Sequence, residues 1–405
     1  MKNNFLWGVA TSSHQIEGEN NNNDWWEAEQ KGLVPKAGKA CDSWHLWLDD
    51  IRALQKLGCN AYRFSIEWSR VMPTPGKIDS SALLHYKKIL RELRERKIKS
   101  CVTLWHFANP IWFAKMGGWE NVKNLKYFYK YCKAVIEALG KYVDLWVILN
   151  EPNIWSLMAY MQGYFPPFKK SLLLALRVQS NLALAHNKVY EMIIRSNKNA
   201  KVGLALSTTL LETKKKSLSA RLKRNVADWL IHYRFLNKVK KNLDFLGINY
   251  YYRAFTDLAS LKADLKETTV QLLLTGKTRG SSIYTKGLYL VLKKYAKYKL
   301  PLYVTENGIG FGSNAARVNY LRDHLFWLEK AMQPPPLSSP LLTGEGRVGV
   351  DVRGYFYWSL LDNYEWMIGY RGKFGLYSVD KKFKRIPRLS AKYYDEAIKD
   401  FGLKF

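Results

Sequence analysis

Residues Leu300–Gly310 read LPLYVTENGIG, an apolar run that gives way to a charge and then to two glycines. This pattern predicts a short buried strand that stops abruptly in a flexible turn. The one charge is Glu306, which comes where the predicted strand stops. A carboxylate at the tip of a buried strand costs free energy unless it is paired or used in chemistry. Glu306 is therefore either a cap for the next helix or a functional residue.

A second stretch has the same design. Residues Leu145–Pro152 read LWVILNEP, an apolar strand that ends in Glu151 and is followed at once by proline. In an α/β barrel, the carboxyl ends of the strands are where the chemistry is built. Two acidic strand ends in one barrel suggest chemistry carried out by a pair of carboxylates.

Short apolar runs recur along the whole chain, and amphipathic stretches such as Ser80–Lys97 separate them. Eight alternating units predict an α/β fold, a single (β/α)8 TIM barrel that occupies residues 1–405. A doubly wound open sheet is the competing topology, but Thr11–Gln15 would make a poor phosphate loop after the first strand. The predicted strands are Phe5–Thr11, Ala61–Ile66, Ser100–Trp105, Leu145–Leu149, Val202–Leu206, Phe245–Tyr251, Leu302–Thr305 and Tyr355–Ser359.

The segment from about residue 333 to 349 differs from the rest because it is rich in Pro, Ser and Gly and has no periodicity. It lies between a predicted helix and the last strand, so we place it at the amino-terminal face of the barrel, opposite the chemistry. We expect a tolerated insertion there. A docking peptide in polyproline conformation is the alternative.

The composition contains 64 basic and 34 acidic residues, a net charge of +30. The basic residues are scattered over predicted helix surfaces without a nucleic-acid motif, so we expect a solvated basic surface and no nucleic-acid partner. The four cysteines lack the spacing of a metal site or a disulfide framework. No apolar run is long enough to cross a bilayer and no signal segment is evident, so we expect a cytoplasmic protein with no membrane partner.

Six stretches carry a resemblance to a known family: FLWGVATSSHQIEG at Phe5–Gly18, YRFSIEWSR at Tyr62–Arg70, NEP at Asn150–Pro152, GINYY at Gly247–Tyr251, TENG at Thr305–Gly308 and WSLLDNYEW at Trp358–Trp366. In this order they resemble the signatures of glycoside hydrolase family one, the β-glucosidase family. The similarity covers nearly the whole chain. It implies a retaining β-glycosidase that needs neither a metal nor an organic cofactor, with a small-molecule β-glycoside or oligosaccharide as its partner.

The resemblance implies separate roles for the two carboxylates. Glu306 would be the nucleophile that forms a covalent glycosyl-enzyme, and Glu151 would be the acid and then the base. That chemistry needs carboxyl groups about 5 Å apart and with unequal pKa values.

Three further residues would support the nucleophile. Arg63 resembles the family arginine that favours an ionised carboxylate, with a purely structural ion pair as its alternative role. Tyr251 resembles the tyrosine that donates a hydrogen bond to the nucleophile. Asn249 lies two residues earlier in the predicted strand, so both side chains share one face of it.

By the same resemblance, a set of residues would bind the sugar. Gln15 and Glu365 would grip hydroxyls of the non-reducing sugar, and Asn150 would lie at the 2-hydroxyl. His106 resembles the family histidine that contacts the hydroxyls of the same sugar, and for His106 taken alone a core histidine is the alternative. The remaining members are the aromatic residues Trp358, Trp366, Trp119 and Phe374, the last two being weaker matches.

Substrate preference follows less directly. A carboxylate at 365 would repel a phosphate, so unphosphorylated β-glucosides are expected, with β-galactosides or β-fucosides as further candidates. A transglycosylase, a 6-phospho-β-glycosidase and a carbohydrate-binding barrel without turnover are the alternatives. The region Ser207–Asp244 and the loop after Gly163 are shorter than is usual in the family, and Ser281 and Ser282 replace an aromatic residue.

Overall fold

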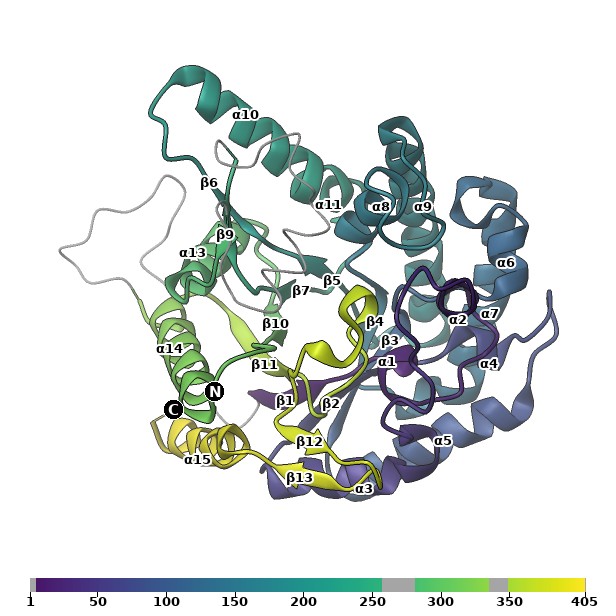
Figure 1. Ribbon diagram of the computed structural model, residues 1–405, viewed down its shortest axis with the longest axis horizontal. Coiled ribbons are helices and arrows are strands. Elements are labelled where there is room, and N and C mark those ends of the chain that lie inside the picture. The colour runs from purple at the N-terminus through teal and green to yellow at the C-terminus, as the bar shows by residue number, and fades with distance from the viewer. Residues whose placement is uncertain (1–4, 257–280, 335–348, 405) are drawn as a thin grey trace.

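The computed structural model describes residues 5–256, 281–334 and 349–404. Eight parallel strands close into a barrel in the order β1-β11-β10-β7-β5-β4-β3-β2 (Figure 1). The barrel closes because β1 pairs with both β11 and β2. The strands are β1 (Leu6–Ala10), β2 (Ala61–Ser65), β3 (Lys99–Trp105), β4 (Leu145–Asn150), β5 (Lys201–Ser207), β7 (Phe245–Asn249), β10 (Leu302–Asn307) and β11 (Val352–Trp358).

The predicted fold class and all eight predicted strands are confirmed. At the carboxyl ends of the strands, where the polar residues lie, two predicted boundaries were wrong by two residues. β7 ends at Asn249 and not at Tyr251, whereas β10 continues through Glu306 to Asn307. The β7–β10 pairing is irregular between Val304 and Glu306. This bulge brings Glu306 opposite Asn249, and bulges commonly re-aim side chains beside active sites.

Helices surround the barrel and bury one face each against it (Figure 1). In α5, Leu90 and Leu93 are buried, and Asp79 caps the helix by accepting from the backbone N–H groups of Ser81 and Ala82. The outer helices are α3 (Ser43–Lys56), α5 (Ser80–Glu95), α7 (Leu125–Leu139), α9 (Leu172–Ser196), α11 (Arg234–Val239), α13 (Lys286–Ala296), α14 (Asn314–Met332) and α15 (Leu389–Lys404).

In the part of the chain that the structure describes, side chains pack against one another inside the barrel. Small residues allow this filling: a Cβ on Gly203 would collide with the Phe245 ring, which packs inside the barrel with Val147 and Phe356. The active end of the barrel is therefore a rim above a packed core.

Shorter elements are inserted mostly where the chain leaves the strands. The short helices are α1 (Ser13–Ile16), α2 (Asp24–Gln30), α4 (Trp68–Val71), α6 (Ile111–Lys115), η1 (Gly118–Glu120), η2 (Val122–Asn124), η3 (Gly140–Tyr142), α8 (Pro152–Tyr160), α10 (Leu218–Asp228), η4 (Trp229–Tyr233) and η5 (Trp366–Arg371). Two small sheets consist of β6 (Leu210–Glu212), β8 (Arg253–Phe255) and β9 (Ser281–Ser282), and of β12 (Tyr377–Val379) and β13 (Arg385–Pro387).

Two sequence-based predictions concern what lies outside these elements. The Pro/Ser/Gly-rich insertion predicted at about 333–349 lies almost wholly outside the described residues, so it stays a prediction. Among the residues that the structure does describe, no helix combines the length and apolar character needed to cross a membrane.

Candidate active site

The carboxyl ends of four strands bring a group of polar side chains together. Arg63 lies on β2, Asn150 on β4, Asn249 on β7 and Glu306 on β10, and all four are buried. Glu151 follows β4 directly. Parallel strands in a closed barrel end at one rim, so residues far apart in the chain meet there.

Both carboxylate oxygens of Glu306 accept a hydrogen bond. Arg63 Nη1 lies 2.6 Å from Oε1, and the Tyr251 hydroxyl donates to Oε2 at 2.8 Å. An ionised carboxylate can only accept hydrogen bonds, and a guanidinium and a phenol both donate them. These surroundings suit a charged Glu306.

Arg63 is itself fixed by several acceptors. Nη1 also donates to the Thr305 carbonyl at 3.0 Å, Nη2 to Asn150 Oδ1 at 2.6 Å and Nε to Thr103 Oγ1 at 3.3 Å. The guanidinium thereby joins side chains of β2, β3, β4 and β10. Its orientation is set by the protein and needs no bound ligand.

Glu151 occupies a different environment. Its backbone is left-handed, with φ 43° and ψ 44°, and Pro152 begins α8 immediately after it. Asn249 Nδ2 donates to Glu151 Oε1 at 3.0 Å. Desolvation by the surrounding protein, followed by the charge of Glu306, raises the pKa of Glu151 to about 8. Glu151 therefore holds its proton at neutral pH.

Asn249 lies differently from the expectation that it supports Glu306. Its Nδ2 contacts Asn150 Oδ1 at 3.2 Å as well as Glu151, and its Oδ1 accepts from Thr305 Oγ1 at 2.6 Å. Among the described residues, the Asn249 side chain therefore hydrogen-bonds to the second carboxyl group and not to the first. The reason is the β10 bulge, which places Asn249 level with Glu306 along the strands while its amide points toward β4.

His106 follows β3 and is also buried. Asn150 Oδ1 already accepts from two donors, so Asn150 Nδ2 is the donor to His106 Nε2 at 3.1 Å. That contact leaves the proton on Nδ1, which has no hydrogen-bond partner among the described residues. Burial, and then the charge of Arg63, holds the pKa of His106 well below its usual range. His106 is thus a neutral imidazole with a free N–H.

Gln15 and Glu365 form the polar end of the group. Gln15 Nε2 donates to the Tyr364 carbonyl at 2.8 Å, and Ser12 Oγ donates to Gln15 Oε1 at 2.6 Å. Glu365 Oε1 accepts from Trp358 Nε1 at 3.0 Å. Burial raises the pKa of Glu365 to about 8, although the Trp358 hydrogen bond opposes this shift.

Aromatic rings lie beside these polar groups. The His106 ring is nearly parallel to Trp358 and to Trp366, with centroids 5.9 and 6.2 Å away. Phe107 packs 5.3 Å from Trp366 and has a left-handed backbone with φ 71°. Phe107 was not predicted as a site residue, because the positive φ that turns it toward Trp366 leaves no mark in the sequence.

The two weaker aromatic candidates differ in position. Phe374 is buried 6.2 Å from the Tyr251 ring, at the edge of the carboxylate group. Trp119 is fully buried, its Nε1 donates to Asn109 Oδ1, and its ring packs on Trp105. A ring without accessible surface cannot stack on a sugar, so the prediction for Trp119 is corrected to a core residue behind the site.

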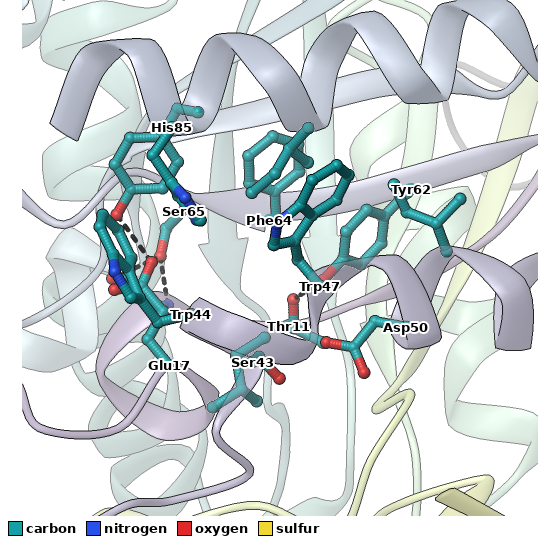
Figure 2. A pocket seen from close by; sticks show the side chains of 15 residues that line it. Thr11, Glu17, Ser43, Trp44, Trp47, Asp50, Tyr62, Phe64, Ser65 and His85 are labelled. Carbon is teal, nitrogen blue, oxygen red and sulfur yellow. Dashed lines mark hydrogen bonds between the residues drawn. The ribbon is translucent and has the colours of Figure 1, made fainter. Parts of the chain in front are cut away.

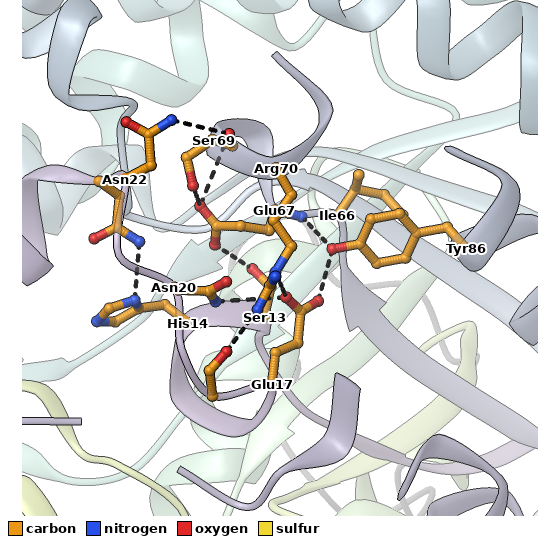
Figure 3. A network of polar contacts seen from close by, with 12 residues as sticks. Ser13, His14, Glu17, Asn20, Asn22, Ile66, Glu67, Ser69, Arg70 and Tyr86 are labelled. Carbon is orange, nitrogen blue, oxygen red and sulfur yellow. Dashed lines mark hydrogen bonds and ion pairs between the residues drawn. The ribbon is translucent and has the colours of Figure 1, made fainter. Parts of the chain in front are cut away.

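A polar network holds the short helix that carries Gln15 (Figure 3). Ser13 N donates to Ser65 Oγ at 2.7 Å, and Ser13 Oγ donates to Glu67 Oε2 at 2.9 Å. Next to it, Glu17 accepts from the Tyr86 hydroxyl at 2.7 Å and from Arg70 Nε at 2.9 Å. Glu17 and Glu67 lie within two of the family-like motifs, but no role was predicted for them from the sequence. Their contacts tie α1 to β2 and α5.

Behind this network is a small cavity of about 30 Å³ (Figure 2). Aromatic side chains such as Tyr62, Phe64 and Trp47 form much of its wall. The volume is about that of one water molecule. The cavity is therefore too small for a sugar ring, and neither Glu151 nor Glu306 lines it.

Comparison with known proteins agrees with this arrangement. The family described as Glycosyl hydrolase family 1 matches residues 1–236 and 231–403. The chain belongs to this family. Several of its relatives are named β-glucosidases, the chain is a glycoside hydrolase, and the predicted family, fold and enzyme class are confirmed.

Three relatives illustrate the similarity. Beta-glucosidase A of Thermotoga maritima is 30% identical over 99% of this chain and 98% of its own length. A beta-glycosidase from Pyrococcus horikoshii has a TM-score of 0.86 and 38% identity, over 99% of this chain and 95% of its own. The family 1 β-glucosidase of Thermotoga maritima in complex with isofagomine lactam has a TM-score of 0.86 and 27% identity, over 99% of both chains.

Proposed function

We propose that this family 1 hydrolase is a retaining β-glycosidase that releases terminal non-reducing β-D-glucosyl residues, and also accepts galactosyl or fucosyl residues, through a covalent glycosyl-enzyme. Glu306 is the nucleophile and Glu151 the acid and base. The contrast between the two carboxyl groups supports this assignment. Glu306 accepts hydrogen bonds from Arg63 and Tyr251, whereas the pKa of Glu151 is raised to about 8.

In the first step, a Glu306 oxygen attacks the anomeric carbon and the bond to the leaving oxygen breaks. The Glu151 proton goes to that oxygen, so the aglycone departs as a neutral alcohol. In the second step, Glu151 takes a proton from water while the water oxygen attacks the anomeric carbon and Glu306 leaves. Two inversions at one carbon retain its configuration.

The change in the role of Glu151 has an electrostatic cause. While Glu306 is charged, it raises the pKa of Glu151 and keeps the acid loaded. In the glycosyl-enzyme, Glu306 is an ester and has lost that charge, so the pKa of Glu151 falls. Glu151 then remains ionised and is ready to act as the base.

Several residues are suited to hold the sugar. The Nδ1–H of His106 is a buried donor, and Glu365 is a buried acceptor. Both N–H groups of the Gln15 amide already donate, to the Tyr364 carbonyl and to Asn363 Oδ1, so its oxygen is the atom that it offers to a sugar hydroxyl. Asn150, between Arg63 and His106, is assigned to the 2-hydroxyl. Trp358 and Trp366 supply apolar faces for the C–H groups of the ring.

Glu365 also favours plain sugars over 6-phosphosugars. It is buried, and it accepts a hydrogen bond from the neutral Trp358 indole. Burial already disfavours negative charge at this point, as the raised pKa of Glu365 shows, so a phosphate placed beside Glu365 would be desolvated at a large cost in free energy. Hydrolysis of an aryl β-glucoside should therefore exceed that of its 6-phosphate.

The decisive experiment compares wild type with Glu306→Gln on an aryl β-glucoside. The variant should lose at least ~10³-fold in kcat/KM, because an amide cannot form the glycosyl ester. Glu137→Gln, a matched change at an exposed position on α7, should keep full activity. NMR of the first product should show β-glucose. Equal turnover by Glu306→Gln, or α-glucose as the first product, would overturn the proposal.

A further inference from the structure

One face of α10, continued by the first residue of η4, exposes a row of large apolar side chains to solvent. The exposed fractions of Leu218, Leu222, Val226 and Trp229 are 83%, 62%, 57% and 50%. Spacings of four, four and three residues put them on one side of a helix. In Figure 1, α10 lies at the upper left edge of the molecule, away from the barrel strands.

The opposite side of α10 is attached to the protein. Ala220 is buried, and Ser217 caps the helix by accepting from the Ala220 N–H. At the carboxyl end, Asp228 accepts from Lys294 Nζ of α13 at 2.6 and 2.8 Å and contacts His232 Nδ1 at 2.6 Å. The helix is therefore held with its apolar row facing outward.

The chain around this row is strongly basic. Residues 213–227 contain six basic side chains and no acidic one. On a helix, Arg221 and Lys223 project from the two sides of the apolar row. The six are Lys214, Lys215, Lys216, Arg221, Lys223 and Arg224.

We propose that α10 docks the protein onto the surface of an anionic lipid bilayer. Leu218, Leu222 and Val226 would enter the boundary between headgroups and acyl chains, while the flanking cations contact lipid phosphates. Trp229 at the end of the row suits the interfacial layer, where indole rings are enriched. This inference replaces the sequence-based expectation of a purely solvated basic surface, and it does not depend on the proposed catalytic mechanism.

Charge and polarity favour this partner over two others. A second copy of the chain meeting α10 face to face would bring Arg221 and Lys223 of one copy against the same cations of the other. A nucleic acid would neutralise the cations but would leave the apolar row without an apolar partner. An anionic bilayer offers acyl chains to the apolar row and phosphates to the cations beside it.

The position of α10 means that docking would bring the active site near substrates held in the bilayer. The chain leaves the carboxyl end of β5, forms β6 and enters α10, so this helix lies at the end of the barrel that carries Glu151 and Glu306. A docked protein would hold its site close to the lipid surface. Glycosides with an apolar aglycone partition into that layer.

The test is co-sedimentation of the full chain with vesicles of phosphatidylcholine, alone or mixed with phosphatidylglycerol. Wild type should bind the mixed vesicles, and added salt should weaken the binding. Leu222→Asp with Val226→Asp should lower the partition coefficient at least tenfold without lowering Tm. Arg221→Gln should lower it roughly fivefold. Leu84→Asp, a matched change at a leucine on α5 that is 53% exposed, should bind like wild type.

Each contrary result identifies another occupant. Unchanged vesicle binding by the double variant Leu222→Asp with Val226→Asp, or equal binding of wild type to pure phosphatidylcholine, would overturn the proposal. A fall in Tm in the double variant would mean that the row is covered by this chain itself. A dimer that the double variant dissociates would assign the row to a second copy. Saturable RNA binding in place of vesicle binding would assign the cations to nucleic acid.

Discussion

Arg63 Nη1 lies 2.6 Å from Glu306 Oε1, although 243 residues separate them in the chain. The pair is buried, with side-chain exposures of 1% and 6%. A buried charge is tolerated only when its partner and its other hydrogen bonds are in place. Arg63 satisfies this condition through its further contacts with Asn150 and Thr103.

Replacing Arg63 with methionine should destabilise the protein as well as reduce activity. The change leaves Glu306 without its cation, and breaking a buried pair costs about 3–5 kcal/mol of unfolding free energy. Urea denaturation measures this loss. Arg52→Met removes an exposed pair with Asp49 and should cost less than about 1 kcal/mol. Similar losses for the two variants would contradict the importance of the buried pair.

The pH profile of kcat/KM should fall on its alkaline side near pH 8. Glu151 must carry a proton to assist the leaving group, and its pKa is raised to about 8, so activity is lost as pH rises through that value. The folded state also binds this proton more tightly than the unfolded chain does. That stabilisation is complete below pH 4.5 and disappears as pH rises to about 8.

The charge of Glu306 contributes to the raised pKa of Glu151, so removing that charge tests the assignment of the pKa. In Glu306→Gln, the pKa of Glu151 should move down, and NMR of a labelled Glu151 carboxyl would follow it. A Glu151 pKa that stays at about 8 in this variant would show that desolvation alone sets it.

Removing the acid should separate the two chemical steps. Glu151→Ala should barely slow glycosylation by a substrate with a good leaving group, because little proton assistance is needed, but it should slow deglycosylation. Azide should then restore turnover and give a β-glycosyl azide, identified by NMR. An α-azide would assign the two carboxylates differently.

The network under Gln15 should affect binding more than chemistry. Glu67 accepts from the hydroxyls of Ser13 and Ser69, so Glu67→Ala leaves buried groups unpaired at a cost of about 1–3 kcal/mol. The resulting shift of α1 would displace Gln15 and raise KM about tenfold with little change in kcat. Glu67→Gln keeps an acceptor oxygen and should recover most of the affinity. A fall in kcat with unchanged KM would exclude this positioning role.

The barrel was predictable because its strands are buried on both faces and therefore read as apolar runs. The observed strands differ from the predicted ranges Val202–Leu206 and Leu145–Leu149 by only one residue at an end. The bulge in β10 was not predictable, since Glu306 and Asn307 are polar and look like a loop, and the predicted strand therefore ends at Thr305. Tertiary pairing keeps them in the strand.

The site was predictable to the extent that motifs repeat those of a family. Period two places Asn249 on the inward face of its strand, but it does not give the distance to Glu151 or to Glu306. The tryptophan content could not separate a core residue such as Trp119 from a ring in the site. The row on α10 was overlooked because the lysines around it were interpreted together with the rest of the basic surface.

The reach of Arg63 has a mechanical consequence. In the strand order, β2 and β10 are separated by β1 and β11. The Arg63 guanidinium therefore links two strands that do not pair with each other, in addition to the backbone hydrogen bonds between neighbouring strands. This link limits how far the strand ends around the site can move apart. A substrate then meets dipoles that are already aligned, and little reorganisation energy is left to be supplied at the moment of bond cleavage.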